Sequence, residues 1–76
     1  MAKYEVRFIR EEVSIERCCV EVEAASPEDA MERVRLHYME GESALTTEEL
    51  YTEEHLKCLG VEESRVVEIE DAREIV

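Results

Sequence analysis

The sequence contains few of the residues on which several common functional sites depend. Its 76 residues include two glycines, one proline and no tryptophan. Phosphate-binding loops and the nucleophile turn of hydrolases each need several closely spaced glycines, so the sequence has neither motif and we do not expect an enzyme. No apolar stretch approaches the ~20 residues that cross a membrane, and the first residues lack the apolar segment of a signal peptide. We therefore predict a cytoplasmic protein with no membrane partner.

Basic residues are also scarce. Nine lysines and arginines stand against 21 acidic residues, which gives a net charge of −12 at pH 7. A chain this acidic repels nucleic acid, so we expect no direct binding to DNA or RNA. The excess is uneven, because residues 1–39 carry nine acidic and six basic side chains, whereas residues 40–76 carry twelve and three. Since 45% of the residues are hydrophobic, we nevertheless expect a folded domain rather than a disordered acidic tail.

The three cysteines, an odd number, do not indicate the disulfide framework of a small secreted domain. Cys18 and Cys19 are adjacent, and neighbouring residues of a strand point to opposite faces. His55 and Cys58 would share one face of a helix, as zinc ligands can, but the sequence has no Cys-x-x-Cys pair. His37 lies on an apolar helical stripe, where a histidine of the core is usual. We predict reduced thiols, no metal and no cofactor.

Two strands and a helix are expected in the first half of the chain. Residues 3–8 and 18–24 alternate between apolar and polar side chains, which is typical of half-buried strands. Ser26 followed by Pro27 predicts the start of a helix, because serine caps the free amides and proline suits the first helical position. Gly41 is a plausible end of this helix.

A second helix is expected in the more acidic half. Thr46 and Glu49 have the spacing of a capping box, and Leu45 and Leu50 have that of a hydrophobic staple. The spacing of the apolar residues that follow predicts that the helix continues to Gly60, either unbroken or as two pieces of which Thr52 caps the second.

The expected elements define a fold class. A last strand is predicted at residues 65–70, with Val67 and Ile69 facing inward. The order β-β-α-α-β predicts an α+β domain in which a three-stranded antiparallel sheet has both helices packed on one face. The handedness of the crossover places the last strand beside the first. Residues 1–76 are expected to form a single domain.

Four short stretches within residues 3–45 match a known pattern: Tyr4-Glu5-Val6, Val22-Glu23-Ala24, Ser26-Pro27-Glu28-Asp29-Ala30 and Gly41-Glu42. With them the chain resembles the DpnD/PcfM-like family of small bacterial proteins. The resemblance implies an accessory protein of a mobile element or restriction cassette, and it supplies no catalytic residues. The Glu-rich helix is an addition to the family pattern. The outline is also similar to that of small acidic anti-CRISPR proteins.

The glutamates of the second half have few basic neighbours. Glu53 has Lys57 one helical turn away, whereas Glu49 and Glu53 form a like-charge pair at the same spacing, which weakens a helix. Uncompensated carboxylates that repel one another within the protein attract the lysines and arginines of a basic binding partner. We therefore predict a non-enzymatic inhibitor whose acidic surface occupies the nucleic-acid-binding site of a basic partner, provided that these elements share one side of the fold. The predicted partner-binding residues are Glu48, Glu49, Tyr51, Glu53, Glu54, Glu62, Glu63, Glu68, Glu70 and Asp71.

Two other interpretations remain open. In the first interpretation, the acidic residues at positions 40–76 form an ordinary solvated surface without a binding role. In the second, the protein is a structural or regulatory module that self-associates as a homodimer, through an open sheet edge or through the apolar surface around Tyr51, and the acidic residues serve solubility.

Overall fold

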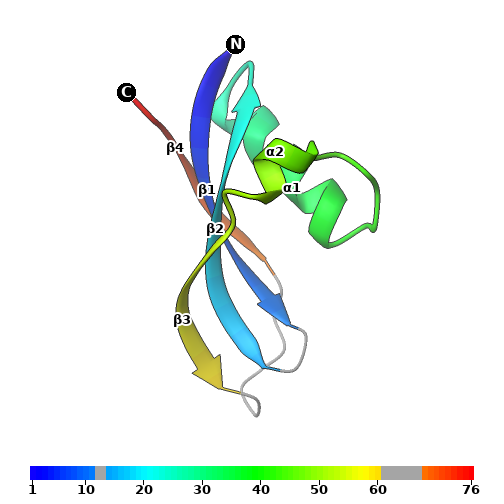
Figure 1. Ribbon diagram of the computed structural model, residues 1–76, viewed down its shortest axis with the longest axis vertical. Helices are drawn as coiled ribbons and strands as arrows, with labels where there is room; N and C mark the ends of the chain where they lie inside the picture. The colour runs from blue at the N-terminus through cyan, green and yellow to red at the C-terminus, as the bar shows by residue number, and fades with distance from the viewer. Residues whose placement is uncertain (12–13, 61–67) are drawn as a thin grey trace.

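The computed structural model describes residues 1–11, 14–60 and 68–76 and contains four strands and two helices. The four strands form one antiparallel sheet in the order β3-β2-β1-β4, and both helices lie on the same side of it (Figure 1). The elements are β1 (Ala2–Glu11), β2 (Ile15–Ala24), α1 (Pro27–Tyr38), α2 (Thr47–Leu50), β3 (Glu54–Gly60) and β4 (Ile69–Glu74).

The predicted first hairpin is confirmed. Strands β1 and β2 pair antiparallel with Val6 opposite Val20 and Phe8 opposite Cys18. Because paired residues share a face of the sheet, the apolar residues of both strands form one surface toward α1. The side chains buried on this surface are Tyr4, Val6, Phe8, Cys18, Val20, Val22 and Ala24.

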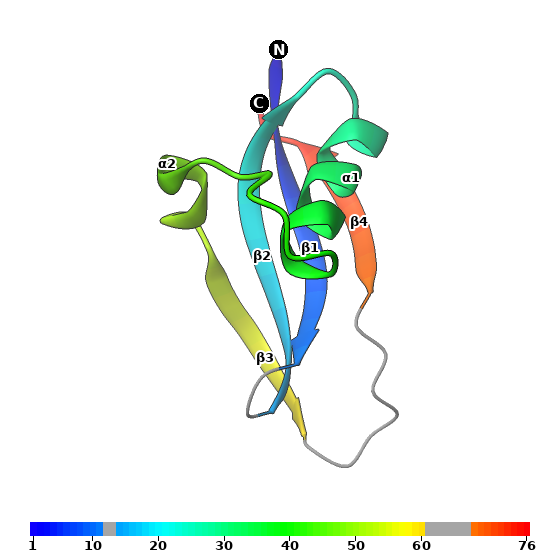
Figure 2. The ribbon, with the colours of Figure 1, turned by 90° about the vertical axis from the view of Figure 1, so that its right-hand side faces the viewer.

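The predicted first helix is also confirmed, as α1. The hydroxyl of Ser26 accepts a hydrogen bond from the amide of Asp29 at 3.1 Å, and Pro27 is the first helical residue. Ala30 and Val34 are buried on the helix face that contacts the sheet. Figure 2 shows α1 in front of the sheet. This helix and the inner face of the sheet enclose the hydrophobic core.

The prediction of a three-stranded sheet with two packed helices is wrong. Residues 54–60 form the edge strand β3 and not the end of a helix, and α2 has only four residues, none of them buried. The hydroxyl of Thr52 explains the change, because it accepts a hydrogen bond from the amide of Glu21 at 2.8 Å and so holds the chain against β2. The next residues then supply backbone hydrogen bonds to the edge of β2. The capping box of Thr46 and Glu49 is nevertheless present.

The last strand lies beside the first, as predicted. Strand β4 pairs antiparallel with β1, with Ile69 opposite Phe8, and Ile69 packs against the core. It ends later than the predicted strand at residues 65–70, because pairing with β1 continues to Glu74. Residues 65–67 of that prediction lie outside the described residues, among them Val67, which was predicted to face inward.

The face of the sheet opposite α1 carries charged side chains and a few apolar ones. In the described ranges 1–11, 14–60 and 68–76, no helix covers this face (Figure 1). Ile9 and Cys19 are buried there. In the same part of the chain, no helix is both long and apolar enough to cross a membrane.

Candidate functional site

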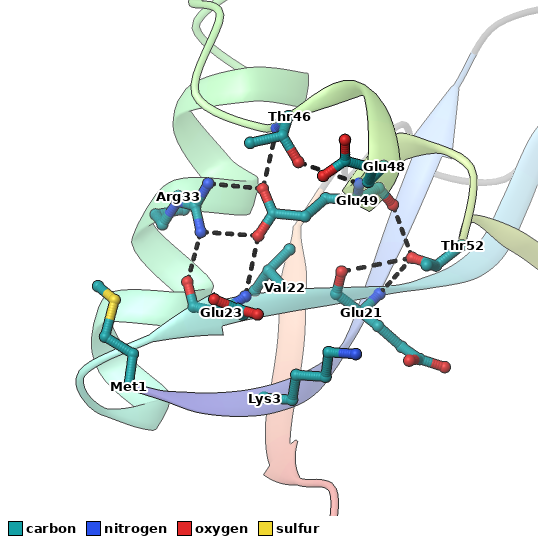
Figure 3. Close-up of a pocket in the computed structure, with 10 residues that line it drawn as sticks. All are labelled: Met1, Lys3, Glu21, Val22, Glu23, Arg33, Thr46, Glu48, Glu49 and Thr52. Carbon is teal, nitrogen blue, oxygen red and sulfur yellow. Dashed lines mark hydrogen bonds and ion pairs between the residues drawn. The ribbon is translucent and has the colours of Figure 1, made fainter.

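Glu49 holds α2 to the rest of the domain. One carboxylate oxygen accepts hydrogen bonds from Arg33 at 2.6 Å and from the amide of Thr46 at 2.9 Å, and the other accepts from Arg33 and from the amide of Glu23, both at 2.9 Å (Figure 3). The side chain is only 11% exposed. Burial alone would raise the pKa of Glu49, but these hydrogen bonds outweigh it and lower the pKa to about 2. Glu49 is therefore an internal anchor.

Glu53 and Glu70 are also paired within the protein. The Glu53 carboxylate accepts hydrogen bonds from Arg10 and from the hydroxyl of Tyr38, the latter at 2.6 Å, and its side chain is 18% exposed. The burial of Tyr38 and its hydrogen bond to Glu53 raise the pKa of the tyrosine. Glu70 accepts two hydrogen bonds from Arg17, at 2.8 and 3.2 Å. Three of the predicted partner-binding acids thus have arginine partners from other elements.

The remaining predicted residues fall into two groups. Glu48, Tyr51 and Glu54 are exposed at the α2–β3 side, and Tyr51 is 84% exposed. Glu68 and Asp71 are exposed near or on β4. Since β3 and β4 are opposite edge strands, three interstrand spacings or about 14 Å separate these edges. Glu62 and Glu63 lie outside the described residues.

Two acidic residues of β2 that the prediction omitted lie close to the first group. Glu21 and Glu23 line a depression of about 440 Å³ together with Glu48 and Lys3, and Figure 3 shows these side chains around it. The sequence contained a signal for them, because they alternate with the buried Val20 and Val22 in β2.

Glu54 extends the same acidic region along β2. It lies opposite Cys19 on the neighbouring strand. Burial is the main cause of the raised pKa of the Cys19 thiol, and the charges of Glu5, Glu54 and Glu21 raise it further while Arg7 lowers it. We call Glu21, Glu23, Glu48, Tyr51 and Glu54 the β2-edge acidic surface. In the described part of the chain, none of its four carboxylates forms an ion pair.

A second polar cluster lies where β3 pairs with β2. The imidazole of His55 contacts Glu16 through Nδ1 at 3.0 Å and Arg10 through Nε2 at 2.9 Å. Because the guanidinium can only donate, Nε2 accepts and the proton of the neutral ring is on Nδ1, where it is donated to Glu16. Arg10 also pairs with Glu53, which joins β1 to the start of β3.

Cys18 completes this cluster. It is fully buried and lies opposite His55 in the β2–β3 ladder. Burial raises the pKa of the Cys18 thiol, and the effect of Arg10, which lowers it, is smaller. The prediction that His55 and Cys58 share a helical face is wrong, since both belong to strand β3. Cys58 is exposed, and Cys19 is buried on the opposite face from Cys18.

His37, the other histidine considered as a functional residue, belongs to α1. Its ring packs edge-on against Tyr38 with centroids 4.9 Å apart. Within the described residues its buried Nδ1 atom has no hydrogen-bond partner.

Comparison of the chain with protein-family models, with curated proteins and with solved structures finds no match. The resemblance to the DpnD/PcfM-like family therefore stays a prediction.

Proposed function

We propose that the protein is a non-enzymatic inhibitor that occupies a basic nucleic-acid-binding site of a partner protein. The observation that carries this proposal is the β2-edge acidic surface, which holds four carboxylates that form no ion pair within the described residues together with the exposed Tyr51. Like charges gathered in this way favour contact with a partner's lysines and arginines, and the long-range field of a −12 chain speeds that encounter.

The internal ion pairs make the binding region narrower than the sequence suggests. Glu49, Glu53 and Glu70 pair with Arg33, Arg10 and Arg17, so they are less available to a partner. Replacing Glu49 or Glu53, whose side chains are 11% and 18% exposed, would also destabilise the domain. Glu48, Tyr51 and Glu54 remain as binding residues, and Glu21 and Glu23 join them. Tyr51 is the expected anchor, because exposed aromatic residues are frequent among the side chains that dominate binding energy.

The specific form of the proposal is a cytoplasmic inhibitor of a CRISPR or restriction complex that is encoded by a phage or mobile element. It rests on the net charge together with the resemblance of residues 3–45 to the DpnD/PcfM-like family. In this role the protein contacts the effector and not the nucleic acid itself.

Affinity capture with matched variants tests the proposal. Tagged protein is incubated with lysates that contain CRISPR and restriction effectors, at two salt concentrations, and the bound proteins are identified by mass spectrometry. We expect one nucleic-acid-binding complex, held less tightly at high salt and lost in Glu48→Lys/Glu54→Lys.

The control pair for this capture is Glu42→Lys/Glu74→Lys. Both control residues are exposed, neither forms an ion pair in the described part of the chain, and the pair changes the net charge equally. The proposal fails if the two pairs of substitutions have equal effects, or if no nucleic-acid-binding protein is captured.

Self-association is a second candidate function because, in the described part of the chain, no further strand pairs with the outer side of β3. Tyr51 precedes the edge strand β3, and Leu56 within that strand is 46% exposed. An open edge strand offers backbone groups to a second copy. Sedimentation velocity separates the two functions, since a tight dimer at low micromolar concentration that salt does not weaken supports self-association.

A further inference from the structure

The cluster between β2 and β3 brings three different metal-binding groups together. Glu16 and Cys18 are two residues apart on β2 and therefore share a face of the sheet, and His55 lies opposite Cys18 on β3. One oxygen, one sulfur and one ring nitrogen of these residues lie within 4.8 Å of one another. The arrangement joins two strands, so its geometry follows from the sheet register.

The three groups match the coordination chemistry of zinc. Zinc in proteins is bound by thiolate, imidazole and carboxylate groups, usually four in a tetrahedron. Two nitrogen or oxygen ligands, each ~2.0–2.1 Å from a tetrahedral zinc, lie ~3.3 Å apart. The 3.0 Å separation between His55 Nδ1 and Glu16 Oε2 is already close to that value. Only the sulfur of Cys18 must approach. We propose that Glu16, Cys18 and His55 bind one zinc ion, with water at the fourth position.

Binding changes the protonation of two ligands. The thiol of Cys18 loses its proton to solvent. Zinc binds to His55 Nδ1, and the proton that Nδ1 carried moves to Nε2 of the same ring. Arg10 then withdraws from Nε2, since both groups would be donors. Glu53 Oε1, 3.8 Å from Nε2, is the nearby acceptor that would orient the ring, in the manner usual for zinc-bound histidines.

The charges of the cluster fit a divalent cation. A zinc ion with one thiolate and one carboxylate is neutral, and Arg10 with Glu53 forms a second neutral pair. At Glu16 Oε2 zinc displaces the hydrogen bond from His55 and a longer contact from Arg10 at 3.8 Å, while Ser14 keeps its hydrogen bond to Oε1. This site does not depend on the proposed inhibitor function, because it lies on the helix side of the sheet and uses none of the β2-edge acidic surface.

Cobalt and zinc binding to the full chain test the site. The protein is freed of metal with a chelator, and Co²⁺ is then added, because a cobalt–thiolate bond gives a near-ultraviolet charge-transfer band. Zinc is added in competition to obtain its affinity and stoichiometry. We expect one ion per chain, the cobalt–thiolate band in the wild type, and displacement of cobalt by zinc.

Three variants make the result specific. We expect Cys18→Ser to lose the charge-transfer band. Since loss of an outer-shell partner alone typically weakens metal binding about 10-fold or more, loss of the direct ligand in His55→Gln should weaken zinc binding by at least that factor. Cys19→Ser removes the adjacent thiol on the opposite face and should bind as the wild type does. Because His55 is exposed, its variant is expected to stay folded, which circular dichroism verifies. The proposal is overturned if the wild type binds no zinc stoichiometrically, or if His55→Gln binds with unchanged affinity.

Discussion

Replacing Glu49 by alanine should destabilise the domain far more than replacing its neighbour Glu48. The substitution removes a bidentate ion pair with Arg33 and the hydrogen bonds that the carboxylate accepts from the amides of Thr46 and Glu23. A hydrogen bond to a charged group contributes about 1.5–3 kcal/mol and a helix cap about 0.5–2 kcal/mol. Arg33 keeps its hydrogen bonds to the carbonyl of Ala44, so the expected loss is about 2–4 kcal/mol.

The lowered pKa of Glu49 predicts that the stability of the domain depends on pH. This pKa is about 2 in the folded protein, against 4.5 for an unperturbed glutamate. Because the folded-state pKa is the lower one, the stabilisation is fully present above pH 4.5 and is lost as the pH falls toward 2. Each pKa unit corresponds to about 1.4 kcal/mol, so the full shift corresponds to about 3.5 kcal/mol before solvent screening reduces it.

Urea denaturation at several pH values measures this effect. At pH 7 we expect a loss of about 2–4 kcal/mol for Glu49→Ala and less than about 0.5 kcal/mol for Glu48→Ala, which is exposed. Between pH 5 and pH 2 the wild type should lose more stability than Glu49→Gln, which has no group to titrate at this position. Equal stabilities of the two alanine variants, or parallel pH profiles of the wild type and Glu49→Gln, would refute the anchoring role.

Three further predictions concern the core and its polar border. Tyr38→Phe removes the hydrogen bond to Glu53 and should lower the free energy of unfolding by about 1 kcal/mol in urea titrations. Val34→Ala leaves a cavity between α1 and the sheet and should cost about 1–3 kcal/mol. In the native protein a thiol reagent should modify the exposed Cys58 quickly, while Cys18 and Cys19 react only after unfolding; fast modification of two or more thiols would contradict their burial.

The elements that the sequence predicted correctly are those whose signals are local. The alternation of apolar and polar residues set the face of β1 and β2, and the serine–proline pair marked the start of α1. These patterns work because each strand or helix buries one face against the same core. The last strand lies beside the first as predicted, but not through the predicted crossover, because the chain leaves α2 into β3, which pairs with β2, before it reaches β4.

Strand β3 could not be predicted in this way. The capping box at Thr46 indicated a helix and the helix exists, but a cap says nothing of where a helix ends. The end is decided by distant contacts, since Thr52 bonds to Glu21 and Glu53 pairs with Arg10. A longer helix would have placed Glu49 and Glu53 in repulsion, whereas the observed turn gives each its own arginine.

The same limit applies to the candidate site. Helical spacing was used to look for cations near the glutamates, but the arginines that pair with Glu49, Glu53 and Glu70 are 16, 43 and 53 residues away. The sheet brings them together, and no local pattern reveals it. Glu21 and Glu23 were visible as the outward residues of a strand, and only the position of α2 beside β2 joins them to Glu48.

Competition with nucleic acid for the captured partner tests the central claim most directly. A labelled DNA or RNA ligand is bound to the purified partner, and its release is followed as the protein is added. The account predicts full displacement by the wild type and by Glu42→Lys/Glu74→Lys, but none by Glu48→Lys/Glu54→Lys. A complex in which the partner holds the protein and the nucleic acid together would contradict the claim that the β2-edge acidic surface occupies the nucleic-acid-binding site.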